Sequence, residues 1–469
     1  MASVDMAGDR PAIAPARTAM GPASRAADQN VADIEHRPDT REKFIPVTRQ
    51  ALMERLTRQH AWPVGQADAA RRFFRYLDYW RQQTYVARLL DLEQTYEPFS
   101  PDSDLLVTRK FTNAERATMQ KRLIEQITQL LEQANFTRID TSRIELILTK
   151  DSHYGLDLHV DLSAFDELLI FYRGATTRRE SKRKLYVWKE EFDVPIFQRL
   201  CIVFKLKPEE DRIRELMQSQ GCSRKEAQRS VRRLTRMLPA QVNSDYVYLK
   251  LFKNMPRSDI EMVFPNTRVR FRMFDKIRLG VTAGGGFGMG VVGTAGKIAV
   301  AANPIALAGA LVALGGVAFR QAMSFLNQRN RYMVTMAQNL YFHAMGDNRG
   351  VMTLLADRAA EEDIKEEMLL YSVLAKETVT KRELKDVDAA IEQYLLNTFG
   401  VTANFDIDDA LSRLIAEGIV TERSDGTFDT LAPEAAAKLI DKKWDAYLDE
   451  LPDQTRNEGL EFDREEAAP

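Results

Sequence analysis

Cysteine and histidine are scarce in this sequence of 469 residues, which contains two cysteines and five histidines. Cys201 and Cys222 are too few for a disulfide framework, and neither has a second cysteine at metal-ligand spacing. This cysteine usage fits a reducing compartment. The motifs G-x-S-x-G and H-E-x-x-H are absent as well, so no familiar hydrolase or zinc-protease site is indicated. The sequence leaves open whether the protein is an enzyme.

A large net charge is also lacking. The chain has 66 basic and 68 acidic residues, a formal charge of -2 and a mean hydropathy of -0.35, which excludes a polytopic transporter. Its length suits two or three domains. The near-equal totals hide an uneven distribution of charge along the chain, because residues 170–280 contain 26 basic and 13 acidic residues. This basic block predicts contact with an anionic partner, either anionic lipid headgroups or nucleic acid.

Charge is almost absent from residues 279–319, a stretch of 41 residues with Lys297 as its single charged residue. One helix of this length would measure about 60 Å, twice the roughly 30 Å hydrocarbon core of a bilayer. Two spans fit better, because Asn303-Pro304 can cap and begin a second helix. We therefore predict a two-helix transmembrane hairpin over residues 279–326, with a buried hairpin of a soluble protein as the alternative. The basic flanks predict that both ends face the cytoplasm, or the matrix in an organelle.

Glycines recur every four residues in the predicted hairpin, which would let helices pack closely within the hairpin or between protomers. These glycines are Gly280, Gly284, Gly288, Gly286 and Gly290. The G-x-G-x-x-G pattern at 288–293 is followed by no carboxylate, and Gly296-Lys297 lacks the Ser or Thr of a phosphate-binding loop. We therefore predict packing surfaces and no nucleotide cofactor.

The hydrophobic pattern changes along the chain. Apolar residues recur at spacings of three and four after residue 41 and alternate after residue 143, which predicts helices followed by strands. The predicted fold class is α+β and multidomain, with a mostly antiparallel sheet. In chain order we predict a disordered leader (1–40), a helical region (41–140), an α+β domain (141–278) with a basic helical insertion (209–238), the transmembrane hairpin (279–326), a helical and winged-helix-like domain (327–451) and an acidic disordered tail (452–469).

One strand carries a candidate metal site. Asp157, His159 and Asp161 alternate with apolar residues, so their side chains would share one face of the strand. Two carboxylates beside an imidazole could bind a divalent metal or position a base. An ordinary half-exposed strand is the favoured interpretation, because nothing else in the chain supplies a matching ligand set.

Arginines gather in two further places. Arg229, Arg232, Arg233 and Arg236 fall on one side of a predicted helix, and Arg268, Arg270 and Arg272 fall on one face of a predicted strand. We predict that these arginines contact anionic lipid. A solvated basic face without a partner and a nucleic-acid surface are the alternatives.

The residue pattern of the C-terminal region predicts three helices followed by two short strands at 419–422 and 427–430. This order of elements is typical of a winged helix. The third helix has an acidic neighbourhood that would repel phosphates, because Asp406, Asp408, Asp409 and Glu417 surround Arg413. DNA binding is therefore not expected, and a protein partner is the favoured role of this domain.

Several segments together resemble a family of uncharacterised membrane proteins similar to transmembrane protein 143, classed as domain of unknown function 3754. The segments are 41–47 (REKFIPV), 165–169 (FDELL), 193–200 (DVPIFQRL), 248–257 (YLKLFKNMPR), 259–262 (DIEM) and 338–342 (QNLYF). The resemblance implies a membrane protein with a short hairpin, and the animal member is mitochondrial. It implies no activity and no catalytic residue.

These observations favour a membrane-anchored, non-catalytic interaction or scaffolding module at the cytoplasmic face of a bacterial inner membrane. Its expected partners are the bilayer and anionic lipids, a second copy through the glycine-rich hairpin, and a protein at the winged-helix-like domain. The alternative is an enzyme, or a factor dependent on a nucleotide or metal, that uses the α+β domain and the polar residues between Lys250 and Glu261.

Overall fold

A computed structural model of the chain describes residues 41–104, 111–140, 157–184, 188–236, 238, 242–265, 268–270, 320, 323, 334 and 340–449. The predicted leader, the stretch 279–319 with its glycines, and the predicted acidic tail lie outside these residues.

The N-terminal part is helical, as predicted. It contains α2 (Arg49–Leu56), η1 (Gln59–Ala61), α3 (Ala67–Tyr96), η2 (Glu97–Phe99) and α4 (Asn113–Gln133). Helix α3 is 30 residues long and buries Phe73, Phe74 and Leu77 at helical spacing. Helix α4 begins with a capping box in which Thr112 and Glu115 satisfy each other's backbone N–H groups.

The middle of the chain forms an antiparallel sheet, also as predicted. Its strand order is β1-β3-β4-β5-β7, with β1 (Thr137–Arg138), β3 (Phe165–Lys184), β4 (Trp188–Leu206), β5 (Tyr248–Pro256) and β7 (Ala344–Asp347). A separate pair joins β2 (Asp157–His159) to β6 (Arg268–Arg270). The short η3 (Leu162–Ala164) precedes β3, and η4 (Arg257–Val263) follows β5.

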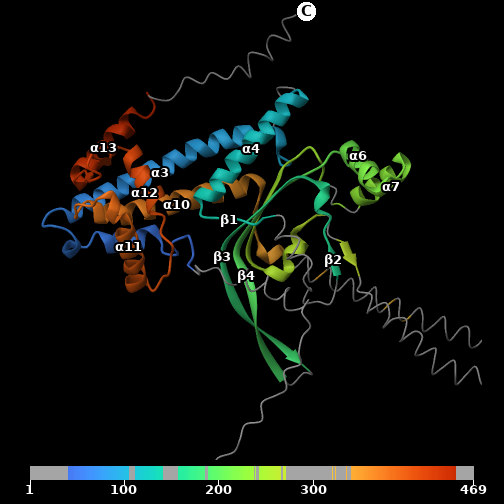
Figure 1. Cartoon of the computed structure of the whole chain (residues 1–469), viewed down its shortest axis with the longest axis horizontal. Helices are drawn as coiled ribbons and strands as arrows, with labels where there is room; N and C mark the ends of the chain where they lie inside the picture. Colours follow the sequence, from blue (N-terminus) through green and yellow to red (C-terminus); the bar gives the residue numbers. More distant parts are fainter. Residues whose placement is uncertain are drawn as a thin grey trace, which may run out of the picture. The chain divides into compact units, whose positions relative to one another are not determined.

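Strands β3 and β4 make one long hairpin, which pairs from Phe165 opposite Leu206 to Lys184 opposite Trp188. Strand β5 pairs with β4 only up to Ile196. Beyond that point the hairpin is a two-stranded ribbon, which Figure 1 shows running past the rest of the sheet. Between β4 and β5 the chain forms the helical pair α6 (Glu209–Gln220) and α7 (Arg224–Thr235), within the predicted basic insertion.

The C-terminal part contains α10 (Asn348–Leu374), η5 (Lys381–Glu383), α11 (Leu384–Phe399), α12 (Ile407–Ala416), β8 (Val420–Glu422), β9 (Phe428–Thr430) and α13 (Pro433–Ala446). Thr380 and Glu383 form a capping box at the start of η5. Strands β8 and β9 pair antiparallel where the two-stranded wing is expected.

Helix α10 belongs to two hydrophobic clusters. Its first half contributes Val351 and Leu355 to a cluster with α4 and one face of the sheet. Its second half contributes Met368 and Tyr371 to a cluster with α2, α3, α11, α12 and α13. The other face of the sheet forms a third cluster, which includes Ile202. Helix α10 therefore connects the sheet to the helical part, and Figure 1 shows it alongside α3.

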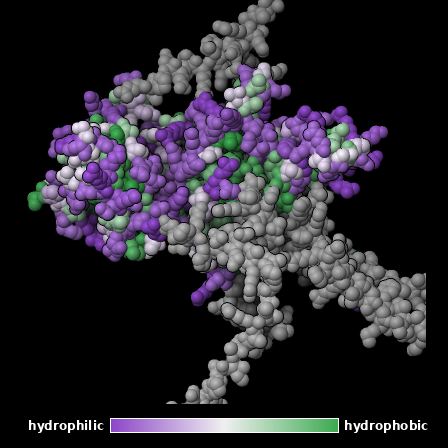
Figure 2. All heavy atoms as spheres, viewed as in Figure 1, coloured by the Kyte–Doolittle hydropathy of each residue, from purple (hydrophilic) through white to green (hydrophobic). Residues whose placement is uncertain are grey.

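The transmembrane part of the predicted fold class is wrong. None of the helices that the structure describes is long and apolar enough to cross a membrane. The long helices α3 and α10 carry charged residues along their length, and Figure 2 shows a mostly hydrophilic surface on the visible face of the described residues. The predicted hairpin segment itself lies outside the described residues apart from Arg320 and Met323. Apolar length in a sequence does not by itself establish a membrane span.

Candidate functional site

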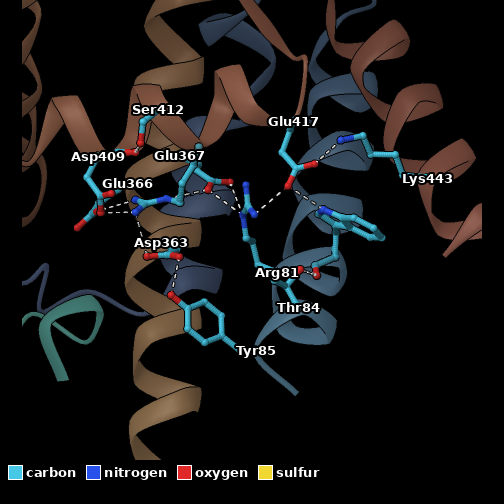
Figure 3. A network of polar contacts seen from close by, with 12 residues as sticks. Arg81, Thr84, Tyr85, Asp363, Glu366, Glu367, Asp409, Ser412, Glu417 and Lys443 are labelled. Atoms are coloured by element: carbon cyan, nitrogen blue, oxygen red, sulfur yellow. Dashed lines mark hydrogen bonds and ion pairs between the residues drawn. The ribbon is translucent and has the colours of Figure 1, made fainter. Parts of the chain in front are cut away.

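A buried run of charged residues lies at the middle of α10, between its two hydrophobic clusters. Glu362, Asp363, Lys365, Glu366 and Glu367 are all at most 5% exposed. Buried charges are tolerated only where partners satisfy them, because an unpaired ion costs several kcal/mol to remove from water. Figure 3 shows the partners, which project from helices distant in sequence.

Arg413 of α12 lies at the centre of this network. Its Nη2 is 2.6 Å from Glu366 Oε2, its Nε is 3.0 Å from Glu367 Oε1, and its Nη1 is 3.2 Å from Asp363 Oδ1. The same Nη1 also contacts Asp409, one helical turn before Arg413. One guanidinium group thus meets four carboxylates, three of which come from α10.

Arg81 of α3 extends the network toward α13. Its Nε is 2.8 Å from Glu367 Oε1 and its Nη1 is 2.9 Å from Glu417 Oε1. Glu417 follows α12 and also accepts a hydrogen bond from the Trp80 indole at 3.0 Å. Its second oxygen is 2.6 Å from Lys443 Nζ on α13. The network therefore links α3, α10, α12 and α13.

At the N-terminal end of this charged run, Glu362 and Lys365 contact the segment around Ile45 and strand β3 of the sheet. Glu362 Oε1 is 2.7 Å from both Lys365 Nζ and Arg173 Nη2 of β3. Glu362 also accepts the Ile45 N–H at 3.0 Å, while Lys365 donates to the Ile45 carbonyl at 2.6 Å. The guanidinium of Arg173 stacks 4.4 Å from the centre of the Phe44 ring.

Burial dominates the acid–base behaviour of these groups. It raises the pKa of Glu366 to about 8 and that of Glu367 to about 7, although the arginines favour the charged forms. Burial also raises the pKa of Asp363, which accepts a 2.8 Å hydrogen bond from Tyr85. For Arg413 burial lowers the pKa, but the surrounding carboxylates outweigh it and raise the pKa overall.

Three of these acids have the arrangement of a cation site. Oxygen atoms of Asp363, Glu366 and Asp409 all lie within 4.8 Å of one another, and carboxylates are suitable ligands for a divalent metal. Arg413, however, makes an ion pair with each of the three. In this arrangement its guanidinium group supplies the positive charge that a metal would bring, so a metal could enter only if Arg413 withdrew.

The predicted metal residues lie elsewhere. Backbone pairing of β2 with β6 puts Asp157 opposite Arg270 and His159 opposite Arg268, so two of the predicted lipid contacts share this strand pair. Asp161 Oδ2 is 2.7 Å from Arg212 Nη2 of α6 and its other oxygen accepts from Ser163. Arg272 lies outside the described residues. Arg229, Arg232 and Arg233 are exposed on α7, and Arg236 is exposed at its C-cap.

Sequence reasoning did not identify the network on α10. The signal was the run EEDIKEE at 361–367, which places six charged residues in seven positions in the middle of the helix. The partners gave no local signal, since Arg81 is 286 positions from Glu367.

Comparison with known families identifies one domain. A family model described as protein of unknown function (DUF3754) matches residues 165–350. The matched segment begins at β3 and ends in the first turn of α10, so it contains Arg173 but none of the network residues on α10 and α12. The match names no membrane family and does not support the finer resemblance to transmembrane protein 143. No solved structure matches the chain.

Replacing Arg413 tests the importance of the network. We expect Arg413→Ala to lower the free energy of unfolding by about 3–5 kcal/mol, because it leaves buried carboxylates without their cation. The matched control is Arg423→Ala, which breaks an exposed pair with Asp429 and should cost less than about 1 kcal/mol. Chemical denaturation measures both values, and equal losses would contradict a structural role for the network.

The raised pKa values predict a pH dependence. Burial raises the pKa of Glu366 to about 8 and that of Glu367 to about 7, whereas the unfolded chain releases these protons near the ordinary value of 4.5. Stability therefore falls as pH rises from about 4.5 to 7 or 8, and above that range both groups are carboxylates paired with the arginines. One such proton contributes at most about 1.4 kcal/mol per pH unit. We expect Glu366→Gln to flatten the dependence measured by denaturation between about pH 5 and pH 8, whereas the exposed Glu422→Gln should leave it unchanged. An unaltered slope in Glu366→Gln would refute the assignment.

Proposed function

We propose that this protein is a non-catalytic interaction module that makes peripheral contact with anionic lipid headgroups through a basic face of α7. The observation that carries the proposal is the exposure of Arg229, Arg232, Arg233 and Arg236 on one helix. Four guanidinium groups on one side of a helix can meet several phosphates at once.

The local structure holds this face outward. Gly221 ends α6 with a positive φ of 62°, a conformation that favours glycine, and Ser223 caps α7 in a capping box with Glu226. The two helices bury Ile213, Leu216, Ala227 and Val231 against each other. Because the apolar side of α7 is buried in this small cluster, its arginine side faces solvent.

Acidic residues of α6 occupy only part of the basic face. Glu210 is 3.0 Å from Arg224, and Glu209 is 3.9 Å from Arg232. Within the described part of the chain, no carboxylate forms an ion pair with Arg229, Arg233 or Arg236. These arginines are therefore in position to bind an external anion.

The row of arginines on α7 also suits the size of an anionic surface. Guanidinium groups spread along one side of a helix of 12 residues match an extended array of phosphates better than one small ligand, which favours lipid headgroups.

The use of the buried acids supports the non-catalytic part of the proposal. Glu366, Glu367 and Asp363 are held by arginines inside the helical part, where they stabilise the packing of four helices. An acid–base role would require a substrate to reach groups that are at most 5% exposed.

Vesicle sedimentation tests the proposal. We expect the full chain to bind vesicles containing phosphatidylglycerol and not vesicles of phosphatidylcholine alone, with binding that weakens as salt is raised. Replacing Arg229, Arg233 and Arg236 together by alanine should weaken binding roughly 100-fold, at about 1 kcal/mol per basic residue.

A charge-matched variant supplies the control. Arg382, Lys385 and Lys442 are exposed on other helices, and replacing them by alanine removes the same charge without touching α7. Equal loss in both variants would indicate non-specific attraction. Binding to duplex DNA that depends on the α7 arginines, without vesicle binding, would replace the lipid proposal by a nucleic-acid one.

A further inference from the structure

The outward side of α3 carries an uncovered row of large apolar side chains. Tyr76, Tyr79, Val86 and Leu90 are 36%, 58%, 48% and 57% exposed, although the opposite side of the same helix is fully buried. Single exposed apolar residues are common, but a row of them along one helix usually marks an interaction surface. We refer to these four residues and Gln83 as the α3 seam.

The spacing of the α3 seam matches the contact positions of a two-stranded coiled coil. Positions 76, 79, 83, 86 and 90 alternate steps of three and four, the pattern that keeps side chains along one line of a helix. Gln83 occupies the middle position. A single polar residue in such a row sets the register of the partner helix. The partner that this pattern fits is therefore another helix with its polar residue at the same level.

The α3 seam is also close to symmetric about Gln83. Tyr76 lies seven residues before it and Leu90 seven residues after it, while Tyr79 and Val86 lie four before and three after. If a second α3 ran antiparallel with Gln83 opposite Gln83, each Tyr76 would meet the partner's Leu90 and the two amides could hydrogen-bond to each other.

Charge at the ends of the α3 seam favours the same arrangement. Arg71, Arg72 and Arg75 precede the seam, and of the nearby acids on this helix Asp78 is already paired with Arg49 at 3.0 Å, which leaves Asp68. Glu434, which lies near Arg72, is itself paired with Lys438 at 3.0 Å. The first end therefore carries net positive charge.

The other end of the α3 seam is acidic. Glu93, Glu97 and Asp104 lie near Arg349, which pairs with Glu93 at 2.5 Å. An antiparallel partner would place this acidic end against the basic end of the first helix, whereas a parallel partner would place like charges together.

From these observations we infer that the protein forms an antiparallel homodimer through the α3 seam. Positions 76–90 span about 21 Å of helix, so the contact is smaller than the roughly 1,200 Å² minimum typical of stable interfaces. The dimer is accordingly reversible and concentration-dependent. This self-association goes beyond the proposed lipid contact, which involves α7.

Analytical ultracentrifugation of the full chain tests the dimer. The average mass should rise from 53.5 kDa toward twice that value as concentration increases. Val86→Glu combined with Leu90→Glu should raise the dimer dissociation constant at least tenfold, because both charges would be buried at the contact. The matched control is Leu396→Glu with Leu448→Glu, two exposed leucines on other segments that should leave the dissociation constant unchanged. Circular dichroism verifies that all variants are folded.

Disulfide trapping distinguishes the orientation. In a Cys222→Ser background, a mixture of Tyr76→Cys and Leu90→Cys chains should form mixed disulfides in preference to self-disulfides. A parallel dimer would form self-disulfides in preference to mixed disulfides. A chain that stays monomeric throughout, a dimer insensitive to the two glutamates, or a preference for self-disulfides would each overturn the inference.

Discussion

The arrangement of the helices depends on the ion pairs that Arg413 and Arg81 make with the carboxylates of α10. Desolvating each of these charges costs several kcal/mol, and the attraction offsets that cost only when the geometry is complete. The donors to the α10 carboxylates come from α3, α12 and β3. Helix α10 can therefore be buried only in the one position where all of these partners reach it.

The location of the charges along α10 has a further consequence. They lie between a hydrophobic cluster on the sheet and another among the helices. A shift of α10 by one turn, about 5.4 Å, would move Glu366 and Glu367 away from the arginines and toward apolar neighbours. The hydrophobic clusters supply most of the favourable burial, but apolar contacts are not directional. The ion pairs add the directionality that aligns the sheet with the helical part.

The local spacing of apolar residues in the sequence was sufficient to predict much of the fold. The helical spacing of Phe73, Phe74 and Leu77 and the alternation in the middle of the chain correctly indicated helices and an antiparallel sheet. It did not reveal that β3 and β4 form a single long hairpin, because the charged segment 178–184 lacks the apolar alternation of a half-buried strand. The transmembrane prediction failed because apolar length, a helix-start signal and basic flanks are local features that carry no tertiary information.

The candidate sites show what distinguishes a structural charge from one available to a partner. Helix α7 has its arginines on one side and its apolar residues on the other, so the helix can bury one side and expose the other. Helix α10 mixes charged and apolar residues all round, and its buried residues include Glu362, Ile364 and Lys365 in near succession. No orientation of such a helix leaves every charge in solvent, so its charges need partners within the protein. That pattern can be read from the sequence, whereas the identity of the partners, Arg81 and Arg413, depends on contacts distant in the chain that only the folded structure reveals.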